Sequence, residues 1–148
     1  MSYDTILLIH LPFVILWLIC LLLSLSFGGI SWLQASRGLS TGSIAVVRFT
    51  TLLAVPFAAG VLITGVMLFA TGDAVGTVAE GAAGSVVLLI VTIPGTALVF
   101  SAARKLTTSG VGSGEAITYA RRVVMVSGVQ FLVILFAASR GFQATGKL

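Results

Sequence analysis

Charged residues are scarce in this chain. Of its 148 residues, 8% are charged and 58% are hydrophobic, whereas an average soluble domain has roughly 25% charged residues. A mean hydropathy of +1.19 points the same way. A water-soluble globular protein is therefore excluded, and the apolar residues must find a solvent other than water.

Cysteine and histidine are equally scarce. With Cys20 as the single cysteine and His10 as the single histidine, a disulfide framework, a CxxC motif and a four-ligand zinc site cannot be built from this chain alone. Acidic residues are absent from the long apolar runs, so a proton-driven transporter lacks its usual groups. The net charge of +4 comes from basic residues that flank apolar runs and form no stripe, so nucleic acid is not an expected partner.

Four long uncharged intervals remain. They lie between Asp4 and Arg37, Arg48 and Asp73, Glu80 and Arg104, and Arg122 and Arg140. Because a spanning helix needs about 20 apolar residues, we expect an all-α polytopic membrane protein. Its single domain, 1–148, is a bundle of four transmembrane helices over about 6–27, 49–70, 85–103 and 119–139. The first run is preceded by no Lys or Arg and is too long for a signal peptide, so it is expected to remain as a helix.

The basic residues predict an orientation. Six of the eight fall in the segments that join the first helix to the second and the third to the fourth: Arg37, Arg48, Arg104, Lys105, Arg121 and Arg122. The positive-inside rule places these segments in the cytoplasm. Both termini, with Asp4, Asp73, Glu80, Arg140 and Lys147, are then expected on the non-cytoplasmic side of a bacterial-type plasma membrane.

His10 is the main candidate for chemistry, because an ionisable group inside a span is a functional candidate by default. At 100° per residue, Val14, Trp17, Leu21, Ser24 and Gly28 share its face of the helix, which is expected to point into the bundle. Three roles stay open for the imidazole: a hydrogen bond to a neighbouring helix, ligation of a haem or metal, and proton transfer. Met67, at a comparable depth in the second helix, is the candidate second ligand.

Other polar and small residues suggest packing roles. Small residues such as Ala54, Ala58, Gly60 and Gly95 let helices approach closely. Gln130, near the middle of the fourth helix, is expected to hydrogen-bond across helices to Thr64, Thr92 or Thr96.

The segment His10-Leu-Pro-Phe-Val-Ile-Leu-Trp17 resembles the opening of the HemJ-type bacterial membrane protoporphyrinogen oxidases and the related CopD-like integral membrane proteins. Pro56 and Gly65 are similar to the proline and glycine of that group's second helix. The resemblance implies a four-helix bundle, binding of haem b or a metal, and His10 as ligand. The third helix opens as Glu80-Gly-Ala-Ala-Gly-Ser-Val-Val, without the further His and Lys residues that oxidase-like members carry there.

Two functions follow from the sequence, and whether the protein is an enzyme stays open. The first is a haem- or metal-binding redox bundle with His10 as axial ligand, Trp17 beside the macrocycle and Met67 as second ligand. The alternative is a non-catalytic accessory or assembly subunit of a larger membrane complex, respiratory or similar, or a homo-oligomer. In that case His10 makes only a structural hydrogen bond.

Overall fold

A computed structural model describes residues 2–71 and 78–144, with side chains in the second half of the chain limited to Leu88 and residues 90–139. It contains four α-helices: α1 (Tyr3–Ser36), α2 (Ile44–Ala70), α3 (Val78–Thr108) and α4 (Gly114–Ala144). No strand occurs in the part of the chain that is described. The prediction of an all-α fold is confirmed.

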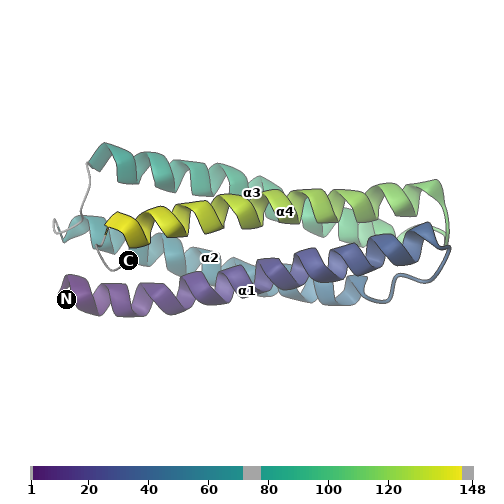
Figure 1. Ribbon diagram of the computed structural model, residues 1–148, viewed down its shortest axis with the longest axis horizontal. Helices are drawn as coiled ribbons and strands as arrows, with labels where there is room; N and C mark the ends of the chain where they lie inside the picture. The colour runs from purple at the N-terminus through teal and green to yellow at the C-terminus, as the bar shows by residue number, and fades with distance from the viewer. Residues whose placement is uncertain (1, 72–77, 145–148) are drawn as a thin grey trace.

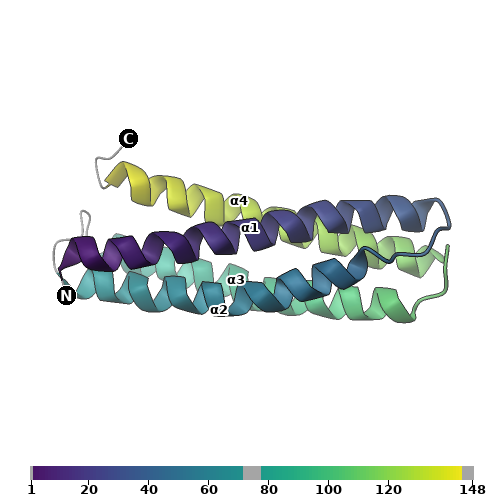
Figure 2. The same cartoon turned by 90° about the horizontal axis from the view of Figure 1, so that it is seen from below.

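The four helices run lengthwise beside one another, and α4 diverges from the other three toward its C-terminal end (Figures 1 and 2). α1 contacts α2 and α4, and α3 contacts α2 and α4. The diagonal pairs α1/α3 and α2/α4 make no contact among the described residues. The start of α1 and the end of α4 lie at one end of the molecule, and the turns 37–43 and 109–113 lie at the other (Figure 1).

The two turns meet at glycines. Gly38 and Gly112 both have positive φ, +67° and +72°, a conformation that glycine adopts without the steric cost of a Cβ. The chain leaves α1 with the Leu39 N–H donating to the Gln34 carbonyl at 2.9 Å, which is the bond that closes a Schellman motif. A Cβ on Gly112 would lie 3.3 Å from the Gly38 Cα, so the turns pack against each other.

The helices extend past the apolar runs that the sequence marks. α1 continues through Gly28 and Gly29 to Ser36, and α2 begins at Ile44 but ends at Ala70, as expected. The 34 residues of α1 measure about 50 Å at roughly 1.5 Å per residue, against about 30 Å for a hydrocarbon core. Helical hydrogen bonding does not stop where the hydrocarbon does, so hydropathy marks the spans and not the helix ends.

Within the described residues, three helices are long and apolar enough to cross a membrane: Tyr3–Ser36, Ile44–Ala70 and the Gly114–Ser139 part of α4. Large apolar side chains face outward on all three, among them Leu8 on α1, Phe49 on α2 and Leu132 on α4. In water such a surface would drive association, so the chain is suited to a membrane interior. The fourth predicted span, 85–103, begins in residues whose side chains lie outside the described part.

The interior has two apolar clusters. One lies toward the turns and joins α1, α2, α3 and α4 through residues such as Ala35, Val47, Val99 and Val123. The other lies toward the start of α1 and is built around Trp17, with Ala54, Ala58 and Ile134. The two clusters contain small residues such as Ala35 and Ala54, and the buried residues also include serines and threonines. Both kinds of residue are common where helices approach closely in lipid.

Candidate functional site

A line of polar pairs joins α1 to α2. His10 Nδ1 lies 2.7 Å from Thr64 Oγ1, Ser24 Oγ lies 2.7 Å from Thr50 Oγ1, and Ser31 Oγ lies 2.6 Å from Ser43 Oγ. We call these three pairs the polar ladder. Ser43 is the N-cap residue of α2, so the ladder covers most of the interface between the two helices.

The polar ladder has a heptad register. On α1, a spacing of seven residues runs through His10, Trp17, Ser24 and Ser31. On α2, which runs in the opposite direction, the same spacing runs through Ser43, Thr50, Phe57 and Thr64. Trp17 and Phe57 therefore occupy the one apolar rung, and both belong to the same apolar cluster. A seven-residue repeat keeps one face of a helix directed at its partner along the whole length.

The direction of each hydrogen bond follows from counting hydroxyl protons, since a hydroxyl has one. Thr64 Oγ1 donates to the Gly60 carbonyl at 2.6 Å, and Thr50 Oγ1 donates to the Val46 carbonyl at 2.9 Å. Ser43 Oγ donates to Gln34 Oε1 at 2.9 Å. Each of these hydroxyls can then only accept from its partner in the polar ladder, so His10 donates through Nδ1–H to Thr64.

This assignment fixes the tautomer of His10. With the proton on Nδ1, neutral imidazole keeps an unprotonated lone pair on Nε2. The ring is held by the close approach of α2, because its Cε1 lies 3.8 Å from where a Cβ on Gly65 would stand. One turn along, the Phe13 ring occupies the space that a Cβ on Gly60 would fill, at 2.5 Å. Gly60 thus makes room for Phe13, whereas a Cβ on Gly65 would be in ordinary van der Waals contact with His10.

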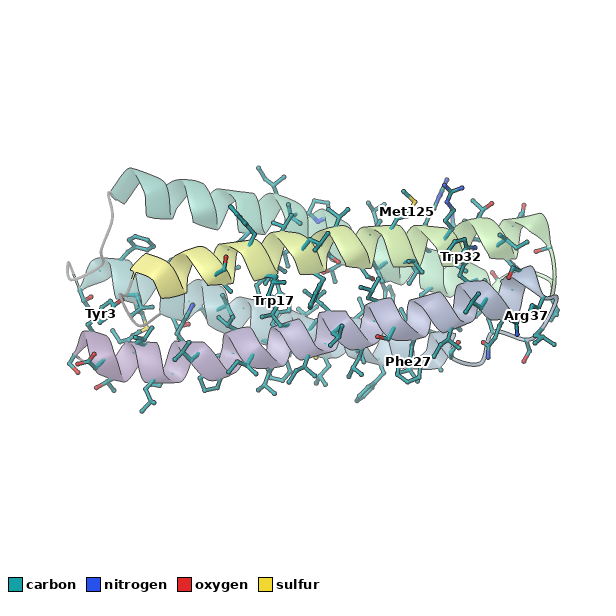
Figure 3. The ribbon with its side chains drawn as sticks, viewed as in Figure 1. Tyr3, Trp17, Phe27, Trp32, Arg37 and Met125 are labelled. Atoms are coloured by element: carbon teal, nitrogen blue, oxygen red, sulfur yellow. The ribbon has the colours of Figure 1, made fainter. Side chains whose placement is uncertain are left out.

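The structure brings together only part of the predicted site. The face expected to point inward does so: Val14, Trp17, Leu21, Ser24 and Gly28 are all buried. Trp17 is 2% exposed and points into the space between the helices (Figure 3). Met67, by contrast, is 39% exposed, so much of its side chain faces outward, one turn after Thr64 on α2.

The described residues hold no group of three or more His, Cys, Asp or Glu side chains that could bind a metal ion. A site made by protein carboxylates, thiolates and imidazoles together is therefore not formed by the described part of this chain. A haem iron needs fewer protein ligands than such a site, because the porphyrin supplies four ligands and the chain supplies only the axial ones. In the described part of the chain, Nε2 of His10 is the candidate for such an axial ligand.

A second polar cluster joins α4 to α3. Gln130 Nε2 donates to the carbonyls of Val91 and Thr92 at 3.3 and 3.2 Å, and lies 3.4 Å from Thr96 Oγ1. Pro94 has no N–H, so the Ile90 carbonyl lacks its donor within the helix. Gln130 contacts the next two carbonyls of the same turn. A Cβ on Gly95 would lie 2.5 Å from Gln130 Nε2. The prediction that Gln130 reaches Thr92 and Thr96 is confirmed, and Thr64 pairs with His10 instead.

Sequence reasoning missed the α2 half of the polar ladder. Ser43, Thr50 and Thr64 are ordinary hydroxyl residues when each is read alone. Their spacing of one heptad, matched to the heptad of His10, Ser24 and Ser31, is the signal that pairs the two helices.

The chain matches no protein-family model, no curated protein and no solved structure at a significant level. Its function must therefore be argued from its own residues.

Proposed function

We propose that this is an integral membrane protein in which all four helices span, and that it binds haem b through Nε2 of His10. The observation that carries the proposal is the 2.7 Å contact between His10 Nδ1 and Thr64 Oγ1, in which His10 is assigned as the donor. Metal-ligating histidines nearly always donate their other ring N–H to a fixed acceptor, which sets the tautomer and orients the ring. The resemblance of the His10–Trp17 segment to HemJ-type and CopD-like proteins supports the same choice.

The roles proposed for the other residues are limited by their positions. Thr64 is a positioning residue that holds the imidazole, and Trp17 provides a buried aromatic wall two turns further along α1. Met67 is retained as a second ligand only if its outward side chain turns toward His10. A bound haem would supply one-electron redox chemistry, while His10 and its hydrogen bond would tune the iron.

The test is the absorption spectrum, oxidised and dithionite-reduced, of detergent-purified protein from cells supplied with haem precursor. A Soret band is expected in the wild type and is expected to be lost in His10→Ala. Thr64→Val, which replaces the hydroxyl that accepts from His10 with a methyl group, should weaken haem retention by about 10- to 100-fold. A colourless wild type, or a His10→Ala variant with the full wild-type band, overturns the proposal.

A second function is favoured by the polar ladder itself. His10 donates to α2 in the same way as Ser24 and Ser31, so a purely structural hydrogen bond accounts for its contact. On this reading the protein is a non-catalytic accessory or assembly subunit of a larger membrane complex, or a homo-oligomer.

His10→Asn separates the two functions. An Asn side chain offers an amide N–H near the position of Nδ1 but has no Nε2. A structural role predicts that His10→Asn restores most of the stability lost in His10→Ala, in a protein that is colourless throughout. A ligand role predicts that His10→Asn loses the Soret band as completely as His10→Ala does.

A further inference from the structure

A groove runs along the outer side of the α3–α4 pair. It consists of two hollows of about 290 and 420 Å³ that share Leu98 and Val126, so they adjoin each other. His10 lines neither of them. The groove is therefore separate from the polar ladder, and we call it the α3–α4 groove.

One end of the α3–α4 groove is basic. Lys105 of α3 and Arg122 of α4 both line it, and both lie against the ring of Tyr119, with Nζ at 5.6 Å and Cζ at 5.8 Å from the ring centroid. Ser101 adds a hydroxyl to the same wall. Neither cation forms an ion pair with a carboxylate among the described residues, so neither positive charge is neutralised there. This end is complementary to an anion.

The other end of the α3–α4 groove is apolar and faces outward. Its lining includes Ile90, Met125 and Val129, all exposed, and Met125 points away from the neighbouring helices (Figure 3). From Lys105 to Ile90 the groove follows α3 for about 22 Å at roughly 1.5 Å per residue. One leaflet of hydrocarbon is about 15 Å thick, so an acyl chain that begins at the basic end has room to extend along the groove.

We propose that the α3–α4 groove binds an anionic phospholipid, with its phosphate at Lys105 and Arg122 and one acyl chain along Leu98 toward Ile90. Two features together select this occupant. The paired cations need an anion, and the apolar continuation opens sideways where lipid chains lie. A free phosphate would use only the first feature, and a neutral lipid only the second. Arg48 rests on Phe100 at 5.9 Å but lines neither hollow, so it is not part of this site.

Native mass spectrometry of the full chain tests the headgroup contact. Detergent-purified protein is offered equal amounts of dioleoyl phosphatidylglycerol and dioleoyl phosphatidylcholine, which share their acyl chains and have an anionic and a zwitterionic headgroup, respectively. The wild type is expected to retain the phosphatidylglycerol preferentially. In the double variant Lys105→Gln/Arg122→Gln this preference should fall by roughly 30-fold, since each basic residue near an anionic surface contributes about fivefold.

Arg104→Gln/Arg121→Gln is the matched control. Both arginines are exposed at the same end of α3 and α4, and neither lines the groove, so the variant removes the same charge and should keep most of the preference. Equal losses of phosphatidylglycerol preference in the two double variants would show that the lipid is attracted by the overall positive charge of this end, and would overturn the proposed site. Displacement of the lipid by millimolar glycerol 3-phosphate would show a free-anion site and overturn it as well.

Leu98→Trp tests the acyl-chain contact without a change of charge. Leu98 lines both hollows and is exposed, so a larger side chain can fill the groove without entering the core. It should reduce phosphatidylglycerol retention several-fold, while Ile63→Trp, on the exposed face of α2, should not. If Leu98→Trp instead abolishes a dimer and leaves lipid retention unchanged, the occupant is a second copy of the chain and the proposal is wrong.

Discussion

At the scale of single residues, the buried hydroxyl groups differ in whether their protons have an acceptor. Ser24 is 2% exposed, and its Oγ lies 2.7 Å from Thr50 Oγ1 across the α1–α2 interface, so its proton has an acceptor. Ser127 is 1% exposed, and its Oγ has no partner among the described residues. A buried hydroxyl without a partner costs about 1–3 kcal/mol, while a hydrogen bond between membrane helices contributes about 0.6 kcal/mol on average.

The two serines should therefore respond oppositely to alanine. Ser24→Ala is expected to lower the free energy of unfolding by about 0.6 kcal/mol, and Ser127→Ala to leave it unchanged or raise it by about 1 kcal/mol. Denaturant titration of the purified protein in mixed micelles measures both values. A loss in Ser127→Ala as large as that in Ser24→Ala would mean that the Ser127 hydroxyl has a partner in the membrane.

The tautomer of His10 is a second prediction at this scale. Because the Thr64 proton is committed to the Gly60 carbonyl, the neutral imidazole should carry its proton on Nδ1 and none on Nε2. Nitrogen-15 NMR of histidine-labelled protein without added haem should show a directly bonded proton on Nδ1 alone. Thr64→Val should remove this preference. A proton found on Nε2 in the wild type would remove the lone pair on which haem ligation depends.

At the scale of helices, the α1–α4 interface depends on one glycine of a tandem pair. A Cβ on Gly28 would lie 2.9 Å from Val123 Cγ1, whereas a Cβ on Gly29 would meet nothing within 4 Å. Val123 is completely buried and has little room to move. Gly28 and Gly29 are thus neighbours in the same helix, and they differ mainly in whether a residue of α4 lies opposite.

Gly28→Ala should lower the free energy of unfolding by about 1–3 kcal/mol, because added volume in a packed interior forces neighbours to shift. Gly29→Ala should be neutral or stabilising by up to about 1 kcal/mol, the difference in helix propensity between glycine and alanine. The same micelle titration compares them. Equal effects would mean that α1 and α4 do not approach each other closely at Gly28.

The helix scale also shows what the sequence could and could not predict. The inward face of α1 followed from helical periodicity alone, because His10, Trp17 and Ser24 lie on one stripe. Its partners on α2 did not follow, since His10 and Thr64 are 54 residues apart and no local pattern pairs them. Met67 was chosen as a ligand for its depth in the membrane, and depth says nothing about which face of α2 it occupies.

At the scale of the whole molecule, three of the four predicted spans coincide with helices apolar enough to cross a membrane. They were predictable because the cost of burying charge in hydrocarbon is large and local. The arrangement of the helices was harder to predict from the sequence. Which helix neighbours which depends on small contacts such as those of Gly28 and Gly95, and each becomes meaningful only when its partner helix is known. The groove between α3 and α4 belongs to this scale, because Lys105 and Arg122 converge only through helix packing.

The orientation in the membrane is the remaining prediction. Arg37, Arg104, Lys105, Arg121 and Arg122 lie near the turns 37–43 and 109–113, at the end opposite to the start of α1 (Figure 1). Asp73, Glu80, Arg140 and Lys147, which the positive-inside rule assigns to the other side, have no described side chains. The basic end should face the cytoplasm, because positively charged segments are retained there during insertion.

Cysteine labelling in intact cells measures this orientation. With the single cysteine removed as Cys20→Ser, Ser2→Cys should react with a membrane-impermeant maleimide from outside. Ser40→Cys, exposed in the turn after α1, should react only after the cells are permeabilised. The reverse pattern would place the turns outside, and labelling of the two positions from the same side would mean that α1 does not cross the membrane. Only the expected result puts the proposed phospholipid site in the cytoplasmic leaflet, where anionic lipids give the surface its negative potential.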